Sequence, residues 1–178
     1  IACDDAPGIV NGFYIDGGRL FVSASEEMNI PFTLWAATAM EFDAPALRFQ
    51  NGSKLRLFAT DQAFAGDIVF EPGSSFLADA ALSVGGDLTF QTNTSTTCSG
   101  PANIPTVRLD LTVNGNLTLD NGAAINATGR GYTLLYGPGK SIGNSGASHG
   151  GQGYPGSASA PYPPYGSVCN PDTWGSGG

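Results

Sequence analysis

The sequence holds little charge and few basic residues, and this limits the partners that it can bind. Charged residues make up 12% of its 178 positions, and fifteen acidic residues stand against seven basic ones, for a formal net charge of −8. Such a balance repels phosphate backbones and anionic membrane surfaces. We therefore expect no nucleic-acid partner.

Long hydrophobic runs are also missing. The longest apolar stretch, residues 30 to 42, is interrupted by Thr33, Thr38 and Glu41. A run this short and this often interrupted does not reach across a bilayer, so no membrane span is predicted.

Cysteine and histidine are scarce, which argues against a metal site, a cofactor or a catalytic triad. The three cysteines, Cys3, Cys98 and Cys169, show no CxxC or Cys/His spacing. A disulfide between two of them is the ordinary interpretation for a secreted chain, with the third thiol buried or paired with another chain. No Ser, Cys or carboxylate is placed by sequence to form a triad with His149, the single histidine. We expect this ring to donate a hydrogen bond to backbone carbonyls of the glycine-rich segment.

Strict alternation of apolar and polar residues is what the sequence does have. Leu109, Leu111, Val113, Leu117 and Leu119 alternate with polar residues, with an interruption at Asn114-Gly115. A period of two indicates strands with one buried face, and the Asn-Gly pair fits a turn with positive φ.

The same pattern occurs upstream. Residues 82 to 90 match residues 111 to 119 at a constant offset, and residues 18 to 22 are a fainter third copy. The apolar face keeps its direction through these turns. This suits a coil of stacked rungs in which each rung covers the open strand edge of its neighbour. The sequence therefore predicts an all-β parallel β-helix, or β-solenoid. An antiparallel β-sandwich is the alternative, because regularly spaced short strands with Gly and Pro turns also predict that fold.

Three further segments carry local predictions. Asn51-Gly52 and residues 71 to 75, which contain Pro72-Gly73, are predicted corners. Residues 32 to 42 keep a period of two and favour strand; as a helix, they would cap the solenoid. The polar residues 91 to 105 are predicted to bulge from a rung as an insertion.

The composition changes after residue 128, which predicts two parts: solenoid rungs over 1–128 and a Gly/Tyr/Pro-rich extension over 129–178. An ordered segment with so little apolar surface has to pack on the solenoid or on a neighbouring subunit. Five of the six tyrosines lie in it, and their flat rings suit either an interface or anchoring to the chain's own core. These are Tyr132, Tyr136, Tyr154, Tyr162 and Tyr165.

The abundance of Gly, Ser, Thr and Asn favours a secreted β-rich protein, extracellular or on the cell surface. Four sequons predict N-glycosylation, with Asn93 the best candidate and Asn51, Asn116 and Asn126 the others. The chain starts at Ile1 and stops within a glycine-rich pattern, as expected of a processed or incomplete piece.

The last third of the chain resembles a known kind of segment. It is similar to the glycine-rich segment of large secreted parallel β-helix proteins of plants, algae and bacteria. The residues that carry the resemblance are 125–132, 137–139, 146–153, 165–167, Pro171 and 174–178. The resemblance implies a cell-surface or extracellular-matrix protein without assigned catalytic residues, whose segment follows one rung and precedes others. Family members often carry a cysteine where this chain has Tyr132, which puts a family-like disulfide in doubt.

Two functions follow as expectations. The first is an extracellular structural or adhesive β-solenoid module, not an enzyme, which joins a filament or surface appendage by self-association or binds matrix or carbohydrate. The second is a polysaccharide-binding or polysaccharide-cleaving β-helix protein. Its paired carboxylates would come from Asp67, Asp87, Asp110 and Asp120, if these line up on one outer face.

Overall fold

The computed structural model divides the chain into two compact units. The solenoid unit comprises residues 1–98 and 108–127, and the glycine unit comprises residues 99–107 and 128–178. The structure describes residues 12–15, 20–23, 26–58, 60–100, 109–143, 145–156, 162–167, 169, 173 and 175–177, the first two ranges as backbone only.

The solenoid unit is built of short parallel strands, and no helix occurs among the described residues. The strands are β1 (Gly12–Ile15), β2 (Leu20–Ser23), β3 (Met28–Ile30), β4 (Thr33–Ala36), β5 (Met40–Asp43), β6 (Ala46–Phe49), β7 (Lys54–Leu57), β8 (Gln62–Phe64), β9 (Asp67–Phe70), β10 (Ser75–Ala78), β11 (Leu82–Val84), β12 (Leu88–Phe90), β13 (Ser95–Thr97), β14 (Leu111–Val113), β15 (Leu117–Leu119) and β16 (Ala124–Ile125). Among the described residues, no helix has the length and hydropathy that a membrane crossing requires.

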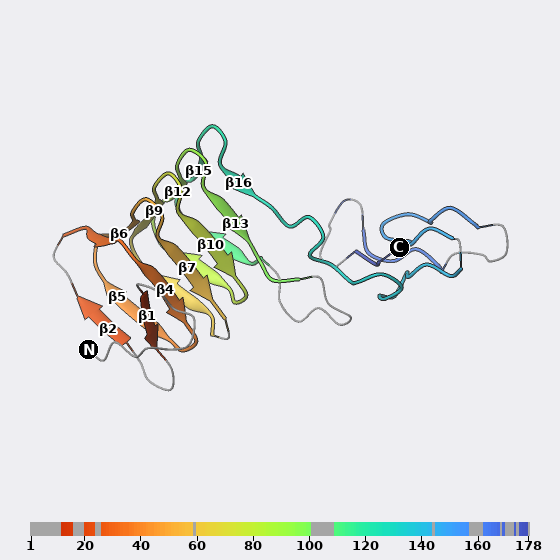
Figure 1. Cartoon of the computed structure of the whole chain (residues 1–178), viewed down its shortest axis with the longest axis horizontal. Helices are drawn as coiled ribbons and strands as arrows, with labels where there is room; N and C mark the ends of the chain where they lie inside the picture. Colours follow the sequence, from red (N-terminus) through yellow and green to blue (C-terminus); the bar gives the residue numbers. More distant parts are fainter. Residues whose placement is uncertain are drawn as a thin grey trace. The chain divides into compact units, whose positions relative to one another are not determined.

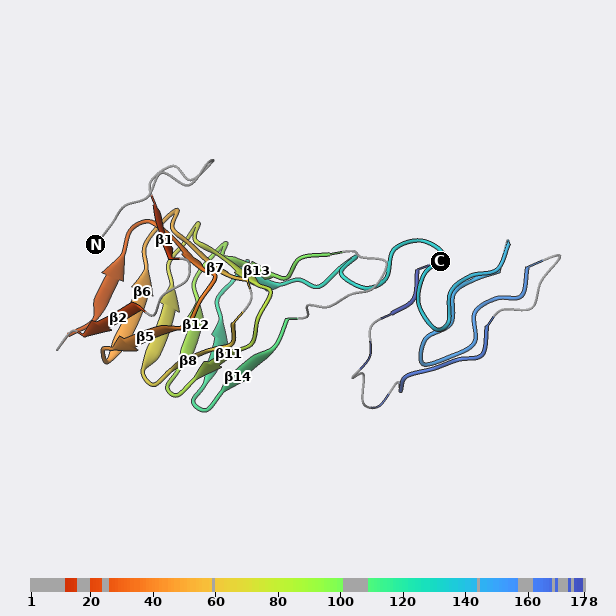
Figure 2. The ribbon, with the colours of Figure 1, turned by 90° about the horizontal axis from the view of Figure 1, so that it is seen from below.

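Each turn of the coil contributes one strand to each of three faces (Figures 1 and 2). One face is the sheet β1-β4-β7-β10-β13-β16, and another is β15-β12-β9-β6-β3. The third consists of two separate sheets, β2-β5 and β14-β11-β8. Every one of these pairings is parallel, which confirms the predicted β-helix over the antiparallel sandwich.

The predicted repeat is also the observed register. Leu82 pairs with Leu111 and Leu88 pairs with Leu117, the offset of 29 residues read from the sequence. Earlier rungs are shorter, since Ser75 pairs with Lys54, 21 residues before it. The last rung is longer because the chain between β13 and β14 includes residues 99–107, which belong to the glycine unit.

A phenylalanine ladder fills the middle of the solenoid. Phe49, Phe70 and Phe90 occupy equivalent places in β6, β9 and β12, and their rings stack with centroids 4.8 and 5.0 Å apart. All three are at most 1% exposed. Alternation puts these residues inward, and each full turn returns the same position to the same column.

One corner of the coil is a stack of similar turns. Gly52, Gly73 and Gly122 have φ values near +79°, and Asn93 has a φ of 60°. In each turn the N–H of the fourth residue donates to the C=O of the first, as Ser74 does to Glu71 over 3.0 Å. A left-handed third residue with this hydrogen bond is the pattern of a type II turn, so both predicted corners are confirmed.

Two local predictions have different outcomes. Residues 32 to 42 form β4 and β5, which confirms the strand prediction. The insertion predicted over 91–105 is wrong at its start, because β13 pairs with β10 and β16. Thr94 and Thr96 are 2% and 0% exposed. Thr96 fills an inward position that Phe76 and Leu55 take in earlier rungs, whereas Thr94 follows the buried Ser53 and Ser74. A polar residue at an inward position breaks the alternation of apolar and polar residues, so the sequence pattern does not reveal the strand β13.

The glycine unit contains neither helix nor strand among its described residues. Hydrogen bonds between distant backbone segments hold it together, such as Tyr132 N–H to Gly175 C=O (3.1 Å) and Gly177 N–H to Tyr136 C=O (3.0 Å). The segments approach so closely that a Cβ at Gly131 would lie 2.6 Å from the carbonyl oxygen of Gly175. Glycine is therefore required for packing at this position.

Candidate functional site

The described end of the solenoid at β14–β16 leaves its inward columns uncovered. Leu88 and Phe90 in β12 are 0% and 1% exposed, whereas their partners Leu117 and Leu119 in β15 are 45% and 43% exposed. Ile125 in β16 is 36% exposed, although its partner Thr96 is completely buried. Each rung is covered by the next, so the last one keeps an apolar surface that water contacts.

The strand edges at this end are open as well. β14, β15 and β16 are each the last strand of their sheets, and no described strand pairs with their outer edges. A row of unpaired backbone groups beside apolar side chains is a template for another strand. We call β14–β16 with Leu117, Leu119 and Ile125 the open end.

The carboxylates proposed for sugar chemistry do not line up as one row. Asp67 and Asp87 occupy equivalent corner positions, where Asp67 Oδ1 accepts the Asp87 N–H (2.8 Å) and Asp87 Oδ1 accepts the Asn116 N–H (2.7 Å). Asp110 precedes β14 and Asp120 follows β15, at two other corners. What the structure shows for Asp67 and Asp87 is a hydrogen-bonded ladder that ties successive corners together.

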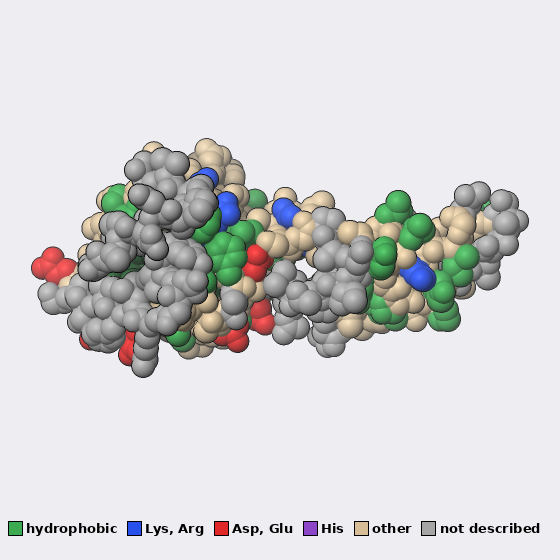
Figure 3. Space-filling model, turned by 60° about the horizontal axis from the view of Figure 1, so that its bottom comes forward, with side chains coloured by type: hydrophobic (Ala, Val, Ile, Leu, Met, Phe, Trp, Pro, Cys, Tyr) green, Lys and Arg blue, Asp and Glu red, His purple; other side chains and the backbone are tan. Residues whose placement is uncertain are grey.

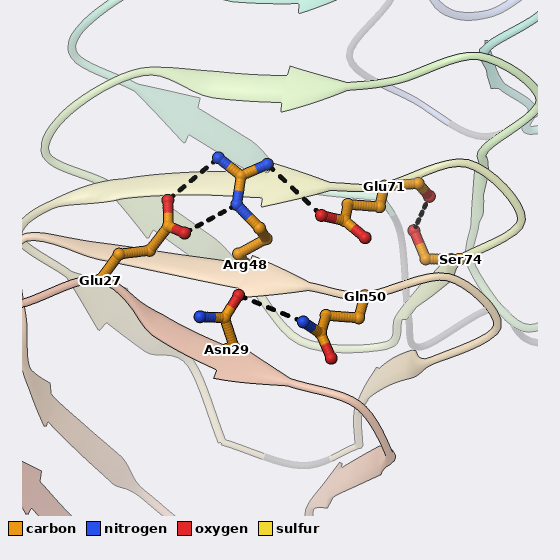
Figure 4. Close-up of polar contacts among 6 residues, drawn as sticks. All are labelled: Glu27, Asn29, Arg48, Gln50, Glu71 and Ser74. Atoms are coloured by element: carbon orange, nitrogen blue, oxygen red, sulfur yellow. Dashed lines mark hydrogen bonds and ion pairs between the residues drawn. The ribbon is translucent and has the colours of Figure 1, made fainter.

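An ion-pair cluster spans three rungs on another face (Figure 4). Arg48 Nε lies 2.8 Å from one Glu27 oxygen and its second nitrogen lies 3.0 Å from the other, in bidentate geometry. The third nitrogen is 3.6 Å from Glu71. Hydrogen bonding to the Arg48 guanidinium holds the pKa of Glu27 below its usual range. The cluster is partly exposed, so its contribution to stability is small, at most about 1 kcal/mol.

A buried glutamine bridges the break between the two sheets of the third face. Gln62 is 7% exposed; its Oε1 accepts the Met40 N–H (2.9 Å), and its Nε2 donates to the Thr38 and Thr60 carbonyls (3.1 and 2.9 Å). The side chain thus satisfies backbone groups where β5 and β8 form no ladder. In the sequence Gln62 looks like an ordinary polar residue, so no sequence pattern predicts this role.

A groove of about 660 Å³ lies on the outer wall at the same break. Its lining includes Glu41, Phe42, Asp43, Phe64, Ser83 and Asn114. Phe42 and Phe64 meet edge to face with ring centroids 6.4 Å apart. Within the part of the chain that the structure describes, no three His, Cys, Asp or Glu side chains group as they would around a metal ion.

His149 lies within the glycine unit. Its Nε2 is 3.1 Å from both the carbonyl oxygen and the hydroxyl of Thr173, and its ring meets the Tyr165 ring edge to face at 4.9 Å. The predicted contact with a backbone carbonyl is present, and whether the nitrogen donates to it depends on the tautomer.

The tyrosines divide between anchoring and exposed positions. Tyr165 accepts a hydrogen bond from Ser176 Oγ (2.8 Å), and Tyr132 is half-buried. Tyr136 and Tyr154 are 45% and 80% exposed, and Tyr162 is 36% exposed. The exposed rings suit an interface, whose existence stays a prediction.

The covalent predictions also stay predictions. Cys98 is a buried thiol in the solenoid unit, Cys169 is an exposed thiol in the glycine unit, and Cys3 lies outside the described residues. The four sequon asparagines, Asn51, Asn93, Asn116 and Asn126, are all exposed. The Asn116 side-chain amide donates to Asp87 (3.2 Å), which ties it to the corner ladder.

Comparison of the chain with protein-family models, with curated proteins and with solved structures found no match.

Proposed function

We propose that this protein is an extracellular structural or adhesive β-solenoid module that self-associates through the open end. The observation that carries the proposal is the contrast within single columns: Phe90 is 1% exposed and its neighbour Leu119 is 43% exposed. Full burial of a leucine stabilises by roughly 1.5–3 kcal/mol, so covering the open end with a further molecule is favourable.

The backbone supports the same proposal. Every interior strand of the long sheets has a partner on both sides, and the last strands β15 and β16 have one described partner each. A subunit that supplies the missing partner satisfies the free N–H and C=O groups and buries the apolar columns together. The glycine-rich segment's resemblance to large secreted β-helix proteins supports an extracellular setting for this assembly.

The test is sedimentation velocity of the purified chain over a wide concentration range. We expect species larger than one chain to grow with concentration, and Leu117→Ser/Leu119→Ser to weaken the association at least tenfold. The matched control is Leu77→Ser, a half-buried leucine on the outer side of β10, which β13 separates from the open end. A single monomeric species at every concentration would refute self-association.

A further inference from the structure

A second exposed apolar surface lies in the glycine unit. Leu134, Leu135 and Tyr136 follow one another in the sequence and are 65%, 49% and 45% exposed. They form a turn that the N–H of Tyr136 closes by donating to the C=O of Thr133 (3.0 Å). We call Leu134–Tyr136 the apolar turn. Three consecutive large apolar side chains in water are unfavourable unless a partner covers them.

The backbone of this turn is strained. Leu135 has a φ of 64°, in the left-handed region that side chains other than those of Gly and Asn rarely adopt. At its other described positions with positive φ the glycine unit uses glycine, namely Gly100, Gly129, Gly137, Gly143, Gly150 and Gly166. Glycine at position 135 would relieve the backbone strain, but it would remove the exposed apolar side chain that leucine provides.

The surrounding contacts hold the strained turn in place. Gly177 donates its N–H to the C=O of Tyr136 (3.0 Å), and a Cβ on Gly177 would collide with the Thr133 carbonyl. Ser176 Oγ accepts the N–H of Gly139 (2.9 Å) and so fixes the chain just after the turn. Strain persists where neighbouring structure over-determines it, and such positions concentrate in binding sites.

Charge decides which surface the apolar turn fits. The solenoid unit carries fourteen acidic and five basic residues, a net charge of −9, whereas the glycine unit carries one acidic and two basic residues, a net charge of +1. In Figure 3 the acidic side chains lie on the solenoid unit, which also shows basic and apolar ones, whereas the glycine unit shows apolar and basic side chains. Two solenoid units repel each other, but a solenoid unit and a glycine unit do not.

We propose that the apolar turn of one copy binds the open end of the solenoid unit of a second copy, an inference that rests on the proposed function. The contact is heterologous: each chain offers one apolar turn and one open end, so copies join head to tail. Leu134 and Leu135 cover the columns that end at Leu117 and Leu119, and the strained, prearranged turn loses little conformational entropy on binding.

The test uses two variants that each remove one side of the contact. Leu134→Ser/Leu135→Gly removes the apolar turn and relieves its backbone, and Leu117→Ser/Leu119→Ser removes the open end. Each alone should sediment as a monomer, with self-association weakened at least tenfold. Mixed together, they should form a 1:1 heterodimer and nothing larger, because one intact turn and one intact open end remain.

Two controls keep the result interpretable. Ile142→Ser removes an apolar side chain of the glycine unit that is 37% exposed and lies outside the turn, and it should assemble like the wild type. Near-UV circular dichroism checks that each variant is folded, and Ile125→Ser replaces Leu117→Ser/Leu119→Ser if that variant unfolds.

The outcomes separate the two proposals. A monomeric wild type refutes self-association itself. A wild type that assembles, with a Leu134→Ser/Leu135→Gly variant that assembles equally well or a mixture that stays monomeric, refutes the role of the turn alone. A wild-type monomer whose β15 amides exchange slowly until the turn is removed would place the contact within one chain and refute the two-copy arrangement.

Discussion

At the scale of single residues, the least expected feature is that a side chain replaces part of a β-ladder. From a buried position at the start of β8, Gln62 bonds the backbone of Met40, Thr38 and Thr60. Its amide is suited to this because it can accept one hydrogen bond and donate two at the same time. The third face stays connected across a break that would otherwise leave buried backbone groups unpaired.

Replacing this glutamine should therefore destabilise the third face of the solenoid unit. Gln62→Leu removes the acceptor of the Met40 N–H and the donor to the Thr38 and Thr60 carbonyls, and we expect the free energy of unfolding to fall by about 1–3 kcal/mol. Urea unfolding measures the loss, and the Met40 amide should exchange its hydrogen faster. Gln50→Leu is the control, since the Gln50 side chain makes a single long contact to Asn29 at 3.4 Å. Equal losses for both variants would contradict the role of Gln62.

At the scale of elements, the corners decide how closely the rungs stack. Gly86 N–H donates to Gly66 C=O (3.1 Å) and Gly115 N–H donates to Gly86 C=O (3.1 Å), so one corner of each rung sits directly on the next. Asp67 and Asp87 reinforce this stack through their neighbours' N–H groups. The strands that follow this corner, β9, β12 and β15, pair in register with one another.

Two glycine substitutions should separate close packing from backbone strain. In Gly86→Ala the new Cβ would meet the Asp67 carboxylate and lie 3.0 Å from the Gly66 carbonyl oxygen. In Gly52→Ala nothing lies within 4 Å of the Cβ, and only the φ of +79° opposes it. We expect Gly52→Ala to cost about 1–2 kcal/mol of stability, and Gly86→Ala at least about 1 kcal/mol more. Thermal unfolding compares them, and a smaller loss for Gly86→Ala would contradict a packing role for this corner.

At the scale of the whole molecule, the two units are stabilised by different means. The solenoid unit buries an apolar core that includes Phe49, Phe70 and Phe90. The described buried side chains of the glycine unit are polar, as in Ser148, which is 0% exposed and bonds Tyr162 and Gly153. Exposure of apolar surface dominates the heat capacity of unfolding, so the two units should differ in it.

Calorimetry should accordingly resolve two transitions, with a small heat-capacity change for the glycine unit. Phe70→Ala should lower only the solenoid transition, by about 3–5 kcal/mol in stability. Ser148→Ala should lower only the other transition, because it removes the hydrogen-bond partner of the Tyr162 C=O and of the Gly153 N–H, both of them partly buried bonds. Ser83→Ala, an exposed position on β11, serves as the neutral control. A single transition that both variants shift alike would show that the units unfold together.

The sequence by itself determined the short alternating strands, the 29-residue match between residues 82–90 and 111–119, and the corners at Asn51-Gly52 and Pro72-Gly73. These are local signals, since alternation and turn chemistry act between neighbours and each rung repeats them. Only the tertiary structure decided for the parallel β-helix over the antiparallel sandwich, and only it showed that Thr94 and Thr96 are buried, that Gln62 joins two sheets and that residues 99–107 belong to the glycine unit. The same is true of the open end and the apolar turn. Leu119 shares its pattern with buried residues, and Leu135 depends on contacts with residues about 40 positions away, which no local pattern records.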